Sequence, residues 1–359
     1  MQSGFRPAPA RISHPISAAA GPGISAALRP VGFLDVLSSA PAESSPRAHC
    51  IHARLRRLAT KPCKKFGLGC CIFALLQLCA LGGMAAAAGP AALQITHRER
   101  SLQPGEVVLF AVQNSRPLMR MSLAGFGREF PCFAEDDGLK WTGFLGIDLQ
   151  TEPGSYRVRV TGMDMDGKTV GGQIVLAVRA KKFPTRTLTV DEQYVSPPAE
   201  ALDRIQTERE QVSGIFASIT PEKFWRGSFL LPVAGGVISA YGKRSVYNGQ
   251  PRSPHAGVDF RGAVGTPVRS PNAGKVVLAK DLYFSGKTII IDHGMGLYSY
   301  FGHMSALSAK EGDAVKSGDI LGRVGATGRA TGPHLHWTVR LVETRIDPLS
   351  LVKITGMPE

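Results

Sequence analysis

Gly332-Pro333-His334-Leu335-His336-Trp337 predicts a β-strand that carries two histidines on one face. Side chains alternate along a strand, so His334 and His336 project to the same side. A second stretch, Pro254-His255-Ala256-Gly257-Val258-Asp259, adds a histidine and an aspartate whose spacing returns both side chains to one side of a strand or tight turn. Together they supply three or four nitrogen and oxygen donors that can converge on one metal ion. Imidazole and carboxylate donors without a thiolate are typical of a catalytic zinc with an open coordination position.

The region around these stretches, residues 229–352, predicts an antiparallel, mostly β domain. Its short apolar runs are 275–279, 288–292, 297–301, 320–324 and 335–341. No helix of normal length fits between them, and parallel strands need crossover connections that usually contain one. Asp292-His293-Gly294-Met295-Gly296 predicts a tight hairpin between the second run and the third.

A second β domain is predicted upstream, over residues 93–180. Strand-like runs cover 106–112, 156–160 and 173–178, and turn signals separate them, which suggests a small, immunoglobulin-like β-sandwich. Asp164-Met165-Asp166-Gly167 is read as a hairpin turn, because the rest of a calcium loop is missing. Residues 181–228 read as a connector, in which apolar residues at helical spacing between Pro198 and Thr220 predict one helix.

The first 88 residues have the composition of a leader. Three lysines between 61 and 65 precede an apolar run from Phe66 to Leu81, and small residues follow to Ala88. This order predicts a signal peptide over 61–88, cleaved near Ala86–Ala88, and a periplasmic or secreted protein. An uncleaved anchor in the inner membrane, facing the periplasm, is the alternative. Residues 1–60 are interpreted as a disordered basic extension or a start codon assigned too far upstream.

Charge and cysteine content restrict the function further. The formal net charge is +14, but residues 1–88 hold ten Lys/Arg and two Asp/Glu, so residues 89–359 carry only +6. That charge argues weakly for an anionic cell-wall polymer as partner. No dense basic stripe with interleaved aromatic residues predicts nucleic-acid binding, and no nucleotide cofactor is expected. Only Cys132 remains after cleavage, so neither an internal disulfide nor a thiolate metal site is predicted.

Five of the nine histidines fall between His255 and His336, each close to glycine, proline or a strand end. The motifs around them resemble those of the lysostaphin-type (LytM-like) zinc endopeptidases of peptidoglycan, in order and in spacing. The resemblance covers roughly residues 230–350 and is carried by four motifs, His255-Ala256-Gly257-Val258-Asp259-Phe260, Gly265-Thr266-Pro267-Val268, Phe301-Gly302-His303-Met304 and Gly328-Arg329-Ala330-Thr331-Gly332-Pro333-His334-Leu335-His336.

The resemblance implies a role for each motif residue. His255, Asp259 and His336 would bind one zinc ion, and His303 and His334 would be catalytic groups beside it. A catalytic zinc lowers the pKa of its water to roughly 7, and a neutral imidazole then takes the proton and returns it to the leaving amine. Tyr247 is a weaker candidate for stabilising the transition state, because its spacing differs from that in relatives.

Other residues of the motif region are assigned to the fold. His293 is interpreted as structural. Arg329 and Thr331 are expected to shape their loop.

The predicted function is that of an exported zinc metalloendopeptidase that hydrolyses peptide stems or cross-links of bacterial peptidoglycan. Glycine bridges and D-alanyl–diaminopimelate links are both compatible with the sequence. The alternative is a catalytically silent murein-binding activator of a cell-wall amidase, which loss of ligands would indicate, and none is lost. A further hypothesis is that the upstream β domain or the connector covers the cleft until a regulatory cell-envelope protein moves it.

Overall fold

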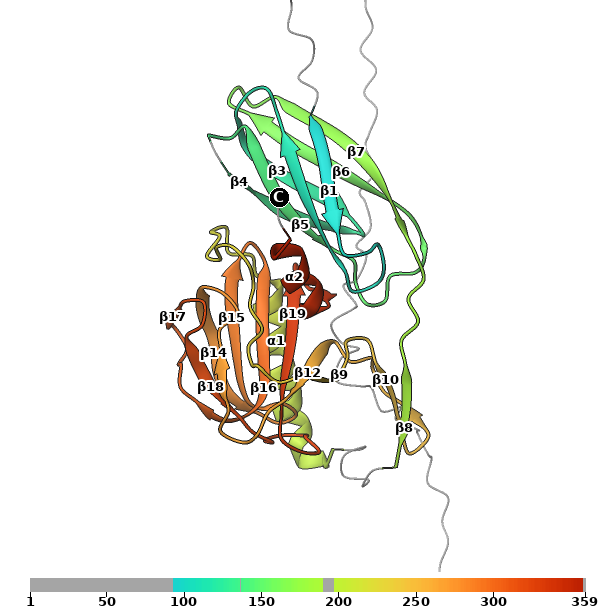
Figure 1. Cartoon of the computed structure of the whole chain (residues 1–359), viewed down its shortest axis with the longest axis vertical. Helices are drawn as coiled ribbons and strands as arrows, with labels where there is room; N and C mark the ends of the chain where they lie inside the picture. Colours follow the sequence, from blue (N-terminus) through green and yellow to red (C-terminus); the bar gives the residue numbers. More distant parts are fainter. Residues whose placement is uncertain (1–92, 136, 190–196, 358–359) are drawn as a thin grey trace, which may run out of the picture. The chain divides into compact units, whose positions relative to one another are not determined.

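The computed structural model describes residues 93–135, 137–189 and 197–357 (Figure 1). The predicted signal peptide and the extension before it lie outside these residues. The described part is mostly β, with antiparallel sheets, which confirms the predicted fold class. No helix within it combines the length and the apolar character that crossing a membrane requires.

Seven strands upstream of the connector form one hydrogen-bonded path in the order β1-β2-β5-β4-β3-β6-β7, with every pair antiparallel. They are β1 (Gln94–Glu99), β2 (Val107–Gln113), β3 (Leu118–Gly125), β4 (Arg128–Ala134), β5 (Lys140–Gly146), β6 (Gly154–Asp164) and β7 (Thr169–Val178). Val108, Phe110, Leu123 and Leu145 are fully buried between them. The all-β prediction holds for this region, and its immunoglobulin-like character stays a prediction.

The hairpin predicted at Asp164 joins β6 to β7. The Asp164 carboxylate accepts hydrogen bonds from the backbone N–H groups of Asp166 and Lys168, and Gly167 has a φ of 77°. This carboxylate therefore closes the turn. The lone Cys132 is buried, and its burial raises the pKa of the thiol to about 12.

The C-terminal sheet follows the order β17-β14-β15-β16-β19-β12-β9, with β13, β18 and β20 paired beside this path. Its strands are β9 (Val237–Ser239), β12 (Gly257–Arg261), β13 (Pro267–Arg269), β14 (Gly274–Leu282), β15 (Gly286–Gly294), β16 (Leu297–Leu307), β17 (Ala314–Val315), β18 (Ile320–Val324), β19 (His334–Leu341) and β20 (Thr344–Ile346). The connector contributes η3 (Ala199–Ala201) and α1 (Leu202–Ala217), and α2 (Pro348–Thr355) ends the described chain. The predicted hairpin is present between β15 and β16, where Met295 and Gly296 both have positive φ, of 54° and 73°.

The two faces of this sheet bury different side chains. Along β19, Leu335 and Trp337 are fully buried on one face, whereas His334 and His336 are half-buried on the other. Part of the histidine-bearing face is covered by α1, whose Phe216 ring lies 5.8 Å from the ring of Tyr298 and 6.4 Å from that of Tyr300 (Figure 1). The helix therefore covers part of the face from which the histidines project.

A small third sheet joins the connector to the C-terminal region. It contains β8 (Thr185–Leu188), β10 (Arg244–Tyr247) and β11 (Gln250–Pro251), in the order β11-β10-β8. β8 pairs with β10 in parallel, an exception to the antiparallel pattern expected from the sequence. The long connection between these two strands, which contains α1, permits this pairing.

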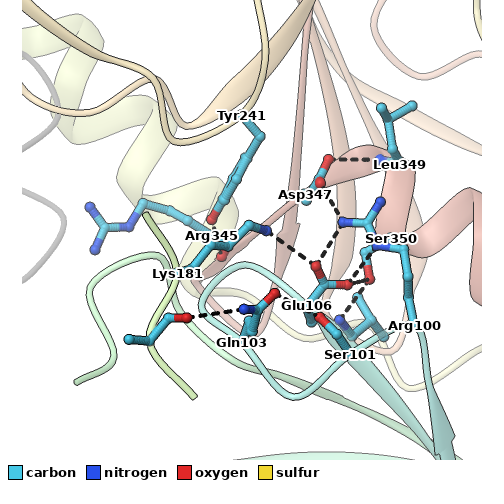
Figure 2. Close-up of polar contacts among 12 residues, drawn as sticks. Arg100, Ser101, Gln103, Glu106, Lys181, Tyr241, Arg345, Asp347, Leu349 and Ser350 are labelled. Atoms are coloured by element: carbon cyan, nitrogen blue, oxygen red, sulfur yellow. Dashed lines mark hydrogen bonds and ion pairs between the residues drawn. The ribbon is translucent and has the colours of Figure 1, made fainter. Parts of the chain in front are cut away.

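The buried carboxylate of Glu106, just before β2, bonds to the C-terminal helix α2. Figure 2 shows Glu106, which is only 2% exposed, accepting hydrogen bonds from Arg100, Lys181 and the hydroxyl of Ser350 in α2. Arg100 also donates to Asp347, the residue that caps α2 through Leu349. Each buried charge in this network has a partner of opposite sign, as burial of a charge requires.

Candidate metal centre

Two of the predicted ligands lie directly opposite each other on neighbouring strands. β12 pairs with β19 in antiparallel register, with Asp259 opposite His336. Directly opposed residues project on the same face of a sheet, and the Asp259 Oδ1 atom lies 2.8 Å from His336 Nδ1. The strand register alone therefore places these two donors together.

The third predicted ligand, His255, comes from the loop just before β12. Its backbone N–H donates to Lys243 O at 2.9 Å, and its carbonyl accepts from the N–H of Gly242 at 2.7 Å. These bonds fix the loop beside the sheet. The His255 Nε2 atom lies 3.1 Å from Asp259 Oδ1 and 3.0 Å from His336 Nδ1.

These three donor atoms fit a tetrahedral metal ion. The group His255, Asp259 and His336 has one ligand atom from each residue, all within 4.8 Å of one another. Zinc bonds of roughly 2.0 Å in tetrahedral geometry would separate neighbouring donors by about 3.3 Å. The observed separations of 2.8, 3.0 and 3.1 Å lie close to that value. Two imidazoles and a carboxylate are also a donor set that suits zinc.

Hydrogen bonds on the outer side fix the tautomers of the histidines. The Nδ1 atoms of His255, His303 and His334 lie 3.1, 2.8 and 2.8 Å from the carbonyl oxygens of Ala240, Thr327 and Gly332. A carbonyl oxygen only accepts, so each Nδ1 carries a proton, and the Nε2 of a neutral ring keeps its lone pair. His336 is oriented the other way, with Nε2 bonded to the Thr338 hydroxyl and Nδ1 facing Asp259. Such outer bonds orient metal-binding histidines.

His303 and His334 lie beside this group, as the resemblance implied. Their ring centroids are 4.8 Å apart, and the His303 ring is 6.1 Å from that of His336. His334 Nε2 lies 3.9 Å from Asp259 Oδ1. The structure therefore gathers all five predicted ligand and catalytic side chains into one cluster.

The backbone of His303 is strained, with a φ of 63° that a non-glycine residue rarely adopts. Its conformation costs about 1–2 kcal/mol. Two bonds hold it in place, from its N–H to Ser285 O at 2.7 Å and from its Nδ1 to Thr327 O at 2.8 Å. Strain of this kind, retained by surrounding contacts, is typical of functional positions.

Burial and charge set the protonation of the cluster. Burial alone would raise the pKa of Asp259, but the neighbouring His255 and His336 outweigh it and lower the pKa. Burial, assisted by the nearby His336, lowers the pKa of His303 to about 3. Burial also lowers the pKa of His336. At neutral pH the aspartate is therefore ionised, and these two imidazoles are neutral and able to accept a proton or a metal.

His293 and Tyr247 have other contacts. His293 is fully buried in β15, with Nδ1 bonded to Ala273 O at 2.7 Å and Nε2 to the Ser299 hydroxyl at 3.0 Å, so neither ring nitrogen is left for a metal. Burial lowers its pKa to about 4. Tyr247 ends β10, just before the Asn248-Gly249 turn, and the guanidinium carbon of Arg252 lies 5.7 Å from its ring.

Sequence analysis missed one residue that supports the site. Glu208 of α1 is 5% exposed, accepts a hydrogen bond from the backbone N–H of Tyr283 at 2.7 Å, and pairs with Arg204 at 2.7 Å. Tyr283 begins the turn that contains Ser285, the acceptor for the His303 backbone. The helical pattern could have indicated its burial, because Glu208 lies on the same buried face of α1 as Ile205, Val212 and Phe216.

The segment that contains this cluster matches known proteins. The model of peptidase family M23 matches residues 253–348, a range that contains all five residues of the cluster. The crystal structure of a protein assigned to peptidase M23 from Pseudomonas aeruginosa superposes with a TM-score of 0.56 at 31% identity, covering 72% of this chain and 96% of that one. The likeness therefore extends well beyond the segment that the family model matches.

Two curated relatives are similar over the cluster region only. The DD-carboxypeptidase/endopeptidase Mpg of Neisseria meningitidis is 37% identical over 97 residues, which make up 27% of this chain and 22% of that protein. The peptidoglycan DD-endopeptidase ShyB of Vibrio cholerae is 35% identical over 96 residues, with the same two shares. The chain thus spans about a fifth of the length of these curated relatives.

Proposed function

The chain belongs to peptidase family M23, and from that premise we propose that it is an exported, zinc-dependent endopeptidase that hydrolyses peptide stems or cross-links of bacterial peptidoglycan. The similarity to proteins named as peptidoglycan endopeptidases supports the substrate. The basic, apolar and small-residue order of residues 61–88 supports export into the periplasm or medium. The alternative is that residues 61–88 are not cleaved and anchor the protein in the inner membrane, facing the periplasm.

His255, Asp259 and His336 are the residues proposed to hold the zinc ion. Their inward donor atoms are 2.8–3.1 Å apart, and outer hydrogen bonds fix His255 and His336. The ion supplies a Lewis acid and lowers the pKa of water toward neutrality when it is bound. The ionised Asp259 offsets part of the ion's charge and anchors both histidines.

His303 and His334 are proposed to move the proton. The Nε2 atom of each ring has a free lone pair, because the Nδ1 proton is donated to a backbone carbonyl. A neutral imidazole can take a proton from the attacking water and return it to the leaving amine. Burial lowers the pKa of His303, so this ring is neutral at pH 7. Once protonated, either ring donates to the oxyanion that develops on the scissile carbonyl.

The convergence of all three donors, with two further histidines beside them, is the observation that carries the proposal. A silent amidase activator would have no need of this set, and the intact set does not favour that alternative.

The test measures zinc content and release of muropeptides from purified peptidoglycan by the parent protein and by two variants. His255→Ala is expected to lose zinc and activity together. His303→Ala is expected to keep zinc and to lose activity by roughly 10²–10⁴-fold, the usual contribution of a general base. His97→Ala is the matched control, because that histidine is partly exposed and bonds only to its neighbour Glu99.

Equal digestion by parent and both variants would contradict the proposal. A zinc-free protein that stimulates an amidase without cutting peptidoglycan would favour the activator instead.

A further inference from the structure

The guanidinium of an arginine lies over an aromatic ring, on two turns next to the histidines. Phe284 lies in the turn between β14 and β15, and Arg329 lies in the loop between β18 and β19. The guanidinium carbon of Arg329 is 4.5 Å from the Phe284 ring centroid, and the Arg329 backbone N–H donates to Phe284 O at 2.7 Å. The guanidinium therefore has a rigid support, and the residue remains exposed.

This pair is tied to the cluster on both sides. Ser285, the residue after Phe284, accepts the backbone hydrogen bond of His303. Thr327, two residues before Arg329, accepts the hydrogen bond of the His303 ring. The same two turns that hold a proposed catalytic group therefore also hold the arginine.

A second arginine lies close to Arg329. Partial desolvation by the surrounding protein lowers the pKa of Arg329, and the nearby Arg252 lowers it further. Tyr247 and Tyr283 raise it. Across residues 93–357, the undescribed gaps apart, no carboxylate forms an ion pair with Arg329. Arg329 thus has a second arginine nearby and, among these residues, no carboxylate of its own. This arrangement favours an anionic ligand at Arg329.

A carboxylate is the ligand that this arrangement fits best. A guanidinium is planar and permanently charged, and its fork of N–H donors matches the two oxygens of a carboxylate. Stacking on Phe284 occupies a face of the guanidinium and leaves its N–H edge for that contact. Peptide stems carry free carboxylates, at their end and on the side chains of acidic and diamino-acid residues. Amidation converts such a group to a neutral carboxamide.

We propose that Arg329, supported by Phe284, is a specificity-determining residue that binds a free carboxylate of the peptide stem beside the scissile bond. The inference rests on the proposed function, because it names the chemistry of the same substrate. It departs from the expectation that Arg329 only shapes its loop. The enzyme accordingly selects stems with free carboxylates over amidated ones.

The experiment compares the full chain and its Arg329→Gln variant on defined cross-linked muropeptides, loaded with zinc. The substrates are identical except that each free carboxylate, terminal or side-chain, is amidated in turn. For the parent, amidation of the contacted carboxylate is expected to lower kcat/KM by roughly 10- to 100-fold, mainly through KM, which corresponds to a hydrogen bond to a charged group. Arg329→Gln is expected to cleave both forms at the rate of the amidated one.

Two more variants separate charge, geometry and folding. Arg329→Lys keeps the charge without the planar fork and is expected to restore only part of the preference. Arg323→Gln is the matched control, because Arg323 is an exposed arginine on β18 that bonds to Gly265 O at 3.0 Å, and its preference is expected to equal that of the parent. Calorimetric binding of both peptides to His303→Ala, with and without Arg329→Gln, measures recognition apart from catalysis.

The outcomes distinguish this inference from the proposed function. If the parent cleaves every amidated form as well as the free acid, or if Arg329→Gln lowers both equally, Arg329 has a structural role and the inference is overturned alone. If the zinc-loaded parent cleaves no muropeptide at all, the proposed function fails and the inference fails with it.

Discussion

Asp148, between strands β5 and β6, and Asp259, in the C-terminal sheet, are two carboxylates in similar surroundings with different partners. Their side chains are 20% and 18% exposed, and in both residues the neighbouring side chains outweigh burial and lower the pKa of the carboxyl. They differ in their partners. Asp148 bonds to the guanidinium of Arg345 at 2.5 and 3.1 Å, whereas Asp259 bonds to two histidines.

The partner decides what each carboxylate can do. Arg345 is permanently charged, so the charge of Asp148 is already compensated and the pair serves the fold. Histidines can be neutral, and their inward lone pairs add to the negative charge of Asp259. A bound cation is what completes that arrangement, so the same residue type is structural in one region and a proposed metal ligand in the other.

Replacing each aspartate by alanine is expected to give the largest effects. Asp259→Ala is expected to lose zinc and at least about 10³-fold in kcat/KM, because a catalytic metal stabilises the transition state by several kcal/mol. Asp148→Ala is expected to keep both zinc and kcat. It should instead lower the free energy of unfolding by about 2–4 kcal/mol, since it leaves Arg345 buried without its partner. Metal analysis, kinetics on muropeptides and urea titration give the three readouts. Loss of zinc in Asp148→Ala would remove the contrast.

Protonation of a buried histidine sharpens the contrast between fold and site. Burial lowers the pKa of His293 from 6.5 to about 4. Between pH 6.5 and about pH 4, His293 is therefore protonated in the unfolded chain and neutral in the folded chain. Stability is therefore expected to fall as the pH drops from about 6.5 to about 4, and one histidine accounts for about 3 kcal/mol of that fall. His293→Gln should lose this part of the pH dependence, measured by urea titration at several pH values, and should retain zinc at pH 7. An unchanged pH profile would assign the dependence to other groups.

The smallest expected effect compares two buried glutamates. Glu208 supports the turn beside His303, whereas Glu106 bonds to Arg100, Lys181 and Ser350 away from the cluster (Figure 2). Glu208→Ala is expected to lower kcat by about 3- to 10-fold, because displacement of catalytic groups is costly, with little change in KM. Glu106→Ala should lower stability and leave kcat unchanged. Equal kcat values in the two variants would show that the turn keeps its position without Glu208.

Much of the fold could be predicted from local patterns. The alternation along β19 and the turn at Met295 and Gly296 are properties of neighbouring residues, and the structure has both where the sequence predicts them. The parallel pairing of β8 with β10 was not predictable in the same way. It joins residues some 60 positions apart, and no local signal specifies the partner of a short strand.

The residues of the candidate site also fall into two groups, those that sequence motifs could identify and those that they could not. The three zinc-type donors and two further histidines could be selected from motifs. The contribution of Glu208 could not, because its partner is a backbone N–H that lies far along the chain. The stacking of Arg329 on Phe284 was also hidden, since the two residues belong to different loops.

The sequence by itself determined the set of donor atoms and the strand that carries two of them, because side-chain chemistry and period-two alternation are local properties. Only the tertiary structure decided that Asp259 lies opposite His336, which nitrogen of each histidine faces inward, and how the backbone of His303 is held. The physical reason is that register, tautomer and strain depend on hydrogen bonds between residues distant in the chain. Those bonds form only when the sheet and its turns are assembled.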